Sequence, residues 1–222
     1  MNKNRIMNIM NWVMGMLLCP LGIAFYTKAN FGLSMVAAPA YIIHIKLKEM
    51  FSWYTQGTSE YIFQTILIII LSAVIKRFNK KYLLSFFIAV LSGFIIDGWL
   101  FVLGGNMPYE SMAMRIFAFI IGELALAIAI AFFFRTDMPV QIYELAVNEI
   151  SDKWGFNKNR VKLIHDISML VLSIILAIVL NQNFKGLGIG TIIITLVNAP
   201  LIKFFGEIID RTFGKRKEDL NG

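Results

Sequence analysis

Polar side chains that interrupt long apolar runs are the residues of this sequence best suited to chemistry. Glu123 stands about ten residues, or ~15 Å, into one such run, and Asn198 lies at a similar depth in the last one. Asp97 and the adjacent pair His165 and Asp166 interrupt two further runs. A charged group at the centre of a helix in hydrocarbon costs at least ~2.5 kcal/mol, so it tends to face a partner or water. We therefore take these residues as candidates for binding a solute or an ion.

Glu123 is open to two interpretations. As a functional group it would couple to a proton or cation, with Asn198 hydrogen-bonding a substrate or Glu123 itself. As a structural group, a protonated Glu123 would hydrogen-bond a neighbouring helix and hold the bundle together. Pro200 removes an intrahelical hydrogen bond two residues after Asn198 and frees a carbonyl group at the same depth. We predict a binding site at a kink from Asn198 to Pro200 that faces Glu123.

Asp97 and the His165–Asp166 pair have stronger structural alternatives. Asp97 is expected in the outer half of its run, where it can reach the membrane interface or a loop. Adjacent residues point about 100° apart around a helix, so His165 and Asp166 do not form a catalytic pair by themselves. Lys162, four residues before Asp166, is expected to pair with it instead.

A glycine-rich segment, Gly186-Leu-Gly-Ile-Gly-Thr191, superficially resembles a phosphate-binding loop. No strand precedes it and no Lys follows its last glycine, so the context argues against such a loop. The glycines favour close helix packing. The alternative is that Thr191 and free backbone N–H groups at this helix N-terminus attract an anion.

Metal, cofactor and enzyme chemistry have little support in the sequence. A single cysteine, Cys19, excludes a disulfide within the chain and a cysteine metal cluster, and His44 and His165 are the two histidines. The apolar runs contain no Ser/His, paired Asp or His-Glu-x-x-His arrangement. We predict no metal site, no cofactor and no enzymatic activity.

The composition places these side chains in a membrane protein. Of the 222 residues, 58% are hydrophobic and 16% are charged, against roughly 25% charged in soluble domains. Each of six apolar runs approaches the ~20 residues that a helix needs to cross a bilayer. We predict an all-α, polytopic membrane helix bundle with six transmembrane helices. The runs are 8–27, 59–75, 82–104, 113–134, 161–180 and 189–209.

The formal net charge of +7 follows from residues that cluster at the ends of these runs. With a cytoplasmic N-terminus, 16 of the 21 basic residues fall on the inner side. The positive-inside rule then predicts that both termini face the cytoplasm. Nucleic-acid binding is not needed to explain the charge.

Two apolar stretches fit neither a spanning helix nor a short loop. Residues 30–51 are broken by Gly32 and Pro39. In residues 137–153, Pro139 stands shortly after Asp137. This order is typical of a helix that Asp caps and whose first turn tolerates proline. Tyr143 then lies on the apolar face of the expected helix. We expect two amphipathic interfacial or re-entrant helices; a re-entrant segment would imply a cavity, because protein or water must cover its backbone.

The sequence aligns with itself when it is displaced by 106 to 107 residues. Residues 25–30 then match 132–137, and Phe78 meets Phe184 without a gap. We predict one membrane domain built of two repeats, about 8–104 and 113–209, followed by a charged cytoplasmic tail at 210–222. Because each repeat has three spans, the second copy must be inverted relative to the first. Secondary transporters often have this design, with the substrate bound at the repeat interface.

Three segments together resemble the YczE/YyaS/YitT-like bacterial membrane proteins. They are Asp137–Ser151, Val161–Asp166 and Gly186–Ile202. The resemblance implies a multi-pass protein of the bacterial plasma membrane, and it supplies no settled activity.

Three function classes remain open at this stage. The leading expectation is a small secondary transporter that moves a small organic solute by alternating access. The alternatives are a substrate-binding subunit of an energy-coupling-factor transporter and a scaffold or accessory protein that does not transport. The expected partners are the lipid bilayer, an unidentified small-molecule solute and a second copy of the chain. The second copy would pack through small residues on the helices, which are Gly15, Gly22, Gly93 and Gly122.

Overall fold

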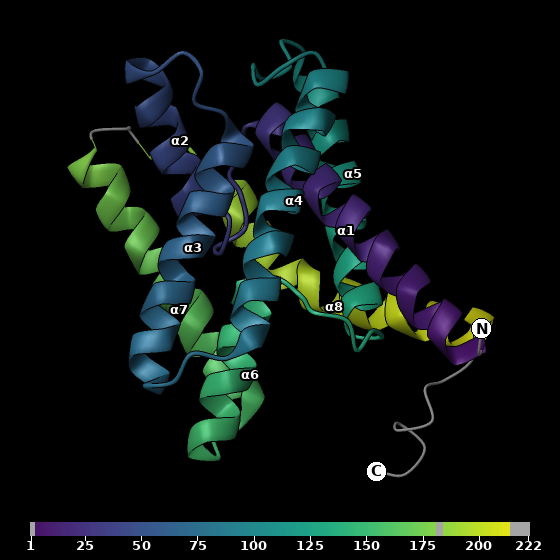
Figure 1. Ribbon diagram of the computed structural model, residues 1–222. Coiled ribbons are helices and arrows are strands. Elements are labelled where there is room, and N and C mark those ends of the chain that lie inside the picture. Colours follow the sequence, from purple (N-terminus) through teal and green to yellow (C-terminus); the bar gives the residue numbers. More distant parts are fainter. Residues whose placement is uncertain (1–2, 181–183, 214–222) are drawn as a thin grey trace.

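The computed structural model describes residues 3–180 and 184–213, and over these residues every regular element is a helix (Figure 1). The helices are α1 (Lys3–Ala29), α2 (Ala38–Met50), α3 (Gln56–Ile75), α4 (Lys80–Val102), α5 (Met112–Phe133), α6 (Ile142–Trp154), α7 (Lys158–Val179) and α8 (Ile189–Phe213). The predicted all-helical bundle is therefore confirmed.

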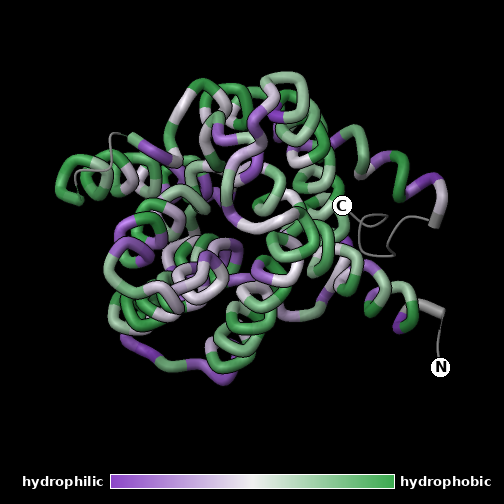
Figure 2. The backbone as a smooth tube through the Cα atoms, turned by 90° about the horizontal axis from the view of Figure 1, so that it is seen from above, coloured by the Kyte–Doolittle hydropathy of each residue, from purple (hydrophilic) through white to green (hydrophobic). Residues whose placement is uncertain are grey.

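Six of the described helices are long and apolar enough to cross a membrane. They are α1, α3, α4, α5, α7 and α8, and each predicted run agrees with its helix to within a few residues. Large apolar side chains such as Phe94, Leu196 and Ile178 remain more than 60% exposed on their outer surfaces. Seen from above, hydrophobic segments dominate these helices (Figure 2). Such surfaces require lipid as the surrounding solvent.

Both termini of the described chain lie on one face of the bundle, which we call the terminal face. It also carries α6 and the turn between α3 and α4, whereas the loops after α2 and α4 lie on the opposite face (Figure 1). Because α8 continues to Phe213, residues 210–213 are helical and do not belong to a tail. The rest of the predicted tail, residues 214–222, lies outside the described residues.

The two short helices differ in how they begin. Helix α2 starts with Pro39 in its first turn, where the missing N–H has no cost. The predicted start of the second short helix at Asp137 was wrong, because α6 begins at Ile142. Side chains of α1 hold the preceding segment in a non-helical conformation: Asp137 N–H donates to Asn8 Oδ1 at 2.8 Å, and Trp12 Nε1 donates to the Pro139 carbonyl at 2.8 Å.

The helices follow the order long, short, long, long twice, and their contacts repeat with it. In this order α1, α2, α3 and α4 correspond to α5, α6, α7 and α8, and α1 packs along α5. The contact of α1 with α4 matches that of α5 with α8, and the contact of α2 with α3 matches that of α6 with α7. The contact of α2 with α7 likewise matches that of α6 with α3. These are the contacts that two copies related by a twofold axis would make. Two contacts lack an equivalent in the described chain. Helix α3 packs closely on α4, but α7 does not pack comparably on α8. Helix α4 contacts α6, but α8 does not pack comparably on α2.

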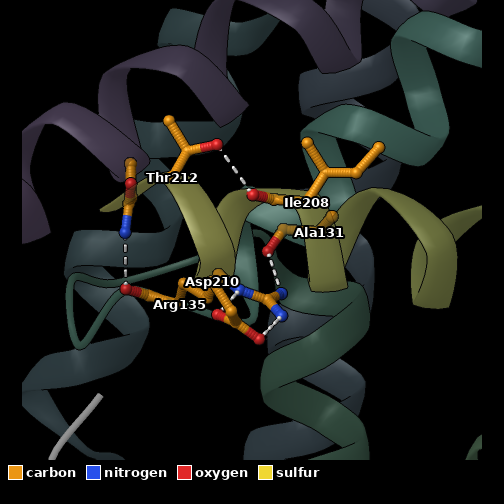
Figure 3. A network of polar contacts seen from close by, with 6 residues as sticks. Ala131, Arg135, Ile208, Asp210 and Thr212 are labelled. Carbon is orange, nitrogen blue, oxygen red and sulfur yellow. Dashed lines mark hydrogen bonds and ion pairs between the residues drawn. The ribbon is translucent and has the colours of Figure 1, made fainter. Parts of the chain in front are cut away.

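The ends of the central helix pair are fixed by polar contacts in both halves. At the end of α1, Arg115 Nε donates to the Ala29 carbonyl at 2.7 Å. At the end of α5, Asn11 Nδ2 donates to the Arg135 carbonyl at 3.0 Å. Arg135 also makes a two-pronged ion pair with Asp210 of α8, each N–O distance being 2.6 Å (Figure 3). This half-buried pair ties the end of α5 to the last helix.

The glycines expected to favour a dimer are used inside the chain. A Cβ on Gly22 would lie 2.9 Å from the Gly122 carbonyl oxygen, and one on Gly15 would lie 2.5 Å from the Phe133 ring. Similarly, a Cβ on Gly93 of α4 would lie 2.6 Å from the carbonyl oxygen of Gly57 in α3. These glycines allow close helix approach within one chain, so they do not form a dimer surface; the homodimer itself stays a prediction.

Candidate binding site

A cavity of about 250 Å³ lies in the interior, where helices of both halves meet. Helices α1, α3, α5, α6, α7 and α8 contribute to its wall, as does the non-helical segment before α2. Apolar groups cover much of the wall, but nine polar side chains interrupt it. These are Ser34, Glu60, Gln141, Tyr143, Glu144, Lys162, Asp166, Thr195 and Asn198.

Glu60 of α3 is the most deeply buried acid in this wall, at 3% exposure. The Tyr143 hydroxyl of α6 donates to its Oε1 at 2.8 Å, and Gln64 Nε2 donates to the same oxygen at 3.0 Å. Burial raises the pKa of Tyr143 well above its usual value, so its hydroxyl remains a donor at physiological pH. The carboxyl group is thus held in place by donors from two helices.

Asp166 of α7 faces the same cavity and has two basic neighbours. Lys162 Nζ lies 3.4 Å from its Oδ2, which is the pairing expected from the sequence. His165 Nδ1 lies 3.2 Å from Oδ1. Glu144 of α6 adds a third carboxyl group to the wall; burial raises the pKa of Glu144, and the nearby Lys162 charge opposes that increase. Acidic groups therefore outnumber basic ones in this wall.

The positions of these groups follow the repeat offset. Glu60 and Asp166 are 106 residues apart, and so are Ser92 and Asn198. Gln141, in the cavity wall, donates through Nε2 to the Ser92 hydroxyl at 3.0 Å. Asn198 also lines the cavity, and its buried Oδ1 lacks a hydrogen-bond partner among the described residues. This oxygen is available to accept a hydrogen bond from a ligand.

Glu123 lies outside the cavity wall. It is 5% exposed and accepts a hydrogen bond at Oε2 from the Tyr26 hydroxyl of α1, while its buried Oε1 has no partner in the described chain. The close approach of Gly22 and Gly122 brings α1 near enough for this contact. The expected pairing of Glu123 with Asn198 is therefore not found, because Glu123 is bonded to α1 and Asn198 lines the cavity.

Three other predicted site residues have local structural contacts. Asp97 Oδ1 accepts from the Gly57 N–H at 2.8 Å, so it caps the first turn of α3. Thr191 is 4% exposed, and its hydroxyl accepts from the Gly188 N–H at 3.4 Å. Pro139 lines a cleft on the terminal face. None of these three lines the central cavity as the structure describes it.

The glycine segment before α8 packs against the segment that follows α1. The Gly190 N–H donates to the Phe31 carbonyl at 2.8 Å, and a Cβ on Gly188 would lie 2.4 Å from the same oxygen. Because Phe31 and Thr191 occupy these N–H groups, the contacts favour the packing interpretation over an anion site.

The cavity is next to an opening on the terminal face. A cleft of about 690 Å³ is lined there by the starts of α4 and α7 and by residues 136–140. It shares Phe133, Phe134, Glu144 and Lys162 with the central cavity. A hollow of about 390 Å³ on the opposite face, beside His44 and Asn106, shares no lining residue with it. In the described conformation, the cavity therefore adjoins the cleft on the terminal face and not the hollow on the opposite face.

Sequence reasoning missed Glu60. Glu60 is the second residue of the predicted run 59–75 and directly follows polar residues, so it stood at the edge of the run and did not interrupt its interior. The signal that would have found it is the offset of 106 residues, which relates Glu60 to the candidate Asp166. Sequence reasoning did select Asn198, Asp166 and Tyr143, which the structure brings into one cavity wall.

The chain belongs to a family of unknown function (DUF6198), which it matches over residues 6–207. It is also 27% identical over 211 residues to the uncharacterized protein YyaS of Bacillus subtilis (strain 168), and the alignment covers 93% of this chain and 96% of that protein. No solved structure matches the chain significantly. The resemblance to YyaS-like proteins is confirmed; the wider grouping with YczE and YitT stays a prediction.

Proposed function

We propose that this protein is a small secondary transporter of the bacterial plasma membrane that moves a small organic solute by alternating access. The single observation that carries the proposal is the cavity between spanning helices of both halves, in whose largely apolar wall Glu60 and Asp166 occupy related positions. Buried ionisable groups in spanning helices are costly and typically belong to substrate or ion pathways. The resemblance and the positive-inside rule support the location, with both termini in the cytoplasm.

The solute in this proposal carries a positively charged group. The wall contains the carboxyl groups of Glu60, Glu144 and Asp166 against the single ammonium of Lys162. Asn198 Oδ1 adds a buried acceptor that is free of partners in the described residues. An amine can donate several hydrogen bonds to such acceptors, and an ammonium group forms a charge-assisted hydrogen bond with any of these carboxyl groups that is ionised.

The opening on the terminal face favours a transporter over the first alternative. A substrate-capturing subunit of an energy-coupling-factor transporter needs a pocket that faces the outside. In the proposed orientation, the central cavity adjoins the cytoplasmic cleft, because the two share Glu144 and Lys162. A scaffold without transport is also disfavoured, since it would have no need of buried carboxyl groups around an internal cavity.

The test is transport by the purified protein in liposomes that contain a pH-sensitive dye. Primary amines and amino acids are added one at a time under an imposed proton gradient, and proton and solute fluxes are followed. Glu60→Gln should reduce the flux at least tenfold, whereas Glu110→Gln, on an exposed loop, should not change it. Flux of no amine or amino acid above that of empty liposomes would overturn the proposal.

The Glu123→Gln variant distinguishes two interpretations of Glu123: that it couples transport to protons, and that it holds α1 in place through a hydrogen bond. If Glu123 couples transport to protons, its replacement should abolish the proton flux. If it serves mainly to bond Tyr26 and α1, solute-driven proton flux should persist and the thermal stability of the protein should fall. Unaltered flux would refute a coupling role for Glu123.

A further inference from the structure

Helices α7 and α8 are separated where the corresponding helices of the first half are closely packed. In α3 and α4, a Cβ on Gly57 would come within 2.0 Å of the Gly93 carbonyl oxygen. Between α7 and α8 there is instead a hollow of about 390 Å³. Figure 1 shows the two helices diverging, with α7 at one edge of the bundle and α8 running obliquely across it.

This hollow, which we call the α7–α8 cleft, is almost completely apolar. Its lining residues include Ile192 and Leu196, which are 62% and 70% exposed on the surface that faces hydrocarbon. The cleft therefore opens sideways toward the lipid. The other apolar residues in its lining are Met35, Leu170, Ile174, Phe184 and Leu187.

The α7–α8 cleft adjoins the central cavity. Both are lined by Met35 and Thr195, which mark the boundary between them. Along α7, the wall passes from Lys162 and Asp166 in the cavity to Ile174 in the cleft. From Lys162 to Ile174 the helix rises about 18 Å, slightly more than half of a ~30 Å hydrocarbon core. One end of this path is acidic and hydrogen-bonding, and the other end is apolar.

We propose that this path binds a single-tailed amphiphile whose ammonium group lies beside Glu60, Asp166 and Asn198 and whose apolar tail lies between α7 and α8. The assignment rests on the proposed function, which it deepens by naming the substrate class. A compact solute would fill only the polar end. An apolar tail matches the remaining lining, and the lateral opening lets it enter from the bilayer.

Native mass spectrometry of the purified protein tests this assignment with three probes at equal concentration. Dodecylamine carries both the charge and the tail, butylamine lacks the tail, and dodecanoate has the opposite charge. Dodecylamine should bind at least tenfold more tightly than either of the others. Equal binding of butylamine and dodecylamine, or of dodecanoate and dodecylamine, would overturn the proposal. Lysophosphatidylethanolamine as a fourth probe distinguishes a lipid source of the amine from a free long-chain amine.

Matched variants locate the bound probe. Leu196→Trp fills the α7–α8 cleft and should weaken dodecylamine binding at least fivefold while butylamine binding stays constant. Phe87→Trp, on the exposed surface of α4, is the control and should change neither. Asp166→Asn should weaken binding of both amines. Equal dodecylamine binding by the Leu196→Trp and Phe87→Trp proteins would overturn the location.

The outcomes separate this inference from the proposed function. Selective dodecylamine binding without any flux in liposomes would leave the amphiphile site standing and refute transport. Flux of short amines without preferential dodecylamine binding would support transport and overturn the amphiphile site.

Discussion

At the scale of single residues, the two most deeply buried acids of the spanning helices each accept a hydrogen bond from a tyrosine of the other half. Glu60 in the first half accepts from Tyr143 in the second, and Glu123 in the second accepts from Tyr26 in the first. A hydroxyl donor reduces the cost of holding a carboxyl group away from water. Both bonds connect the halves, so any movement of one half against the other must preserve or exchange them.

Tyr143→Phe tests how strongly the contact with Glu60 stabilises the described conformation. The change removes the hydroxyl donor but keeps the ring, so unfolding in detergent should become easier by about 1–3 kcal/mol. Tyr61→Phe, next to Glu60 on α3 and less buried than Tyr143, should change it by less than about 0.5 kcal/mol. Thermal unfolding followed by circular dichroism measures both. Equal stabilities of the two variants would show that the Tyr143 hydroxyl contributes nothing.

The success of the sequence interpretation also varied by residue. Asn198 and Asp166 were found because a polar group inside an apolar run is visible without a structure. Of the two interpretations of Glu123, the hydrogen bond to a neighbouring helix matches the contact with Tyr26. The suggested pairing with Asn198 is not found, because depth in the membrane was estimated but direction around the helix was not. Which neighbour Glu123 reaches depends on the close approach of α1 and α5 at Gly22 and Gly122, a contact between distant parts of the chain.

His44 should make the protein less stable in acid. Burial lowers the pKa of His44 to about 4, with a further contribution from the Lys48 charge, whereas an unfolded histidine titrates near 6.5. Below pH 6.5 the unfolded chain therefore binds more protons, and stability decreases as the pH falls toward about 4. The full effect is about 3 kcal/mol. The unfolding midpoint measured from pH 7.5 to pH 5 should fall less for His44→Gln than for the wild-type protein; parallel curves would contradict this.

At the scale of elements, the spanning helices were predictable and the ends of the short ones were not. A run of about twenty apolar residues has one stable arrangement in hydrocarbon, because a helix satisfies every backbone group within the segment. The start of α6 depends instead on Asn8 and Trp12, which bond residues 137 and 139 from the far end of the sequence. Local helix signals at Asp137 and Pro139 were outweighed by these long-range contacts.

The packing of α3 on α4 predicts opposite effects for two glycines of the same helix. A Cβ on Gly93 would lie 2.6 Å from a backbone oxygen of α3, so Gly93→Ala must separate the helices at a cost of about 1–3 kcal/mol. A Cβ on Gly98 would meet nothing within 4 Å, so Gly98→Ala should be neutral or stabilise the helix by about 0.5–1 kcal/mol. Unfolding midpoints of the two variants provide the comparison. A Gly93→Ala protein as stable as Gly98→Ala would contradict the close contact.

At the scale of the whole molecule, two halves with matching contacts adopt unequal arrangements. Helix α3 packs closely against α4, whereas a cleft separates α7 from α8. If the halves are inverted copies, exchanging these arrangements would close the α7–α8 cleft and part α3 from α4. The exchange would also move the opening of the cavity from the terminal face to the opposite face. Alternating access then requires no new type of packing, because each half would adopt the arrangement of the other.

Cross-linking across the α7–α8 cleft tests this exchange directly. Cys19 is the single cysteine, so Cys19→Ala supplies a thiol-free background for Leu170→Cys together with Leu196→Cys. A short thiol cross-linker should react when α7 closes on α8, hold that state and stop the flux of the transported solute. A long flexible cross-linker should join the same thiols and leave most of the flux, and each single-cysteine protein should retain its flux with either reagent. Undiminished flux after complete reaction with the short cross-linker would mean that the two helices do not need to part again during transport, and the exchange of arrangements would be refuted.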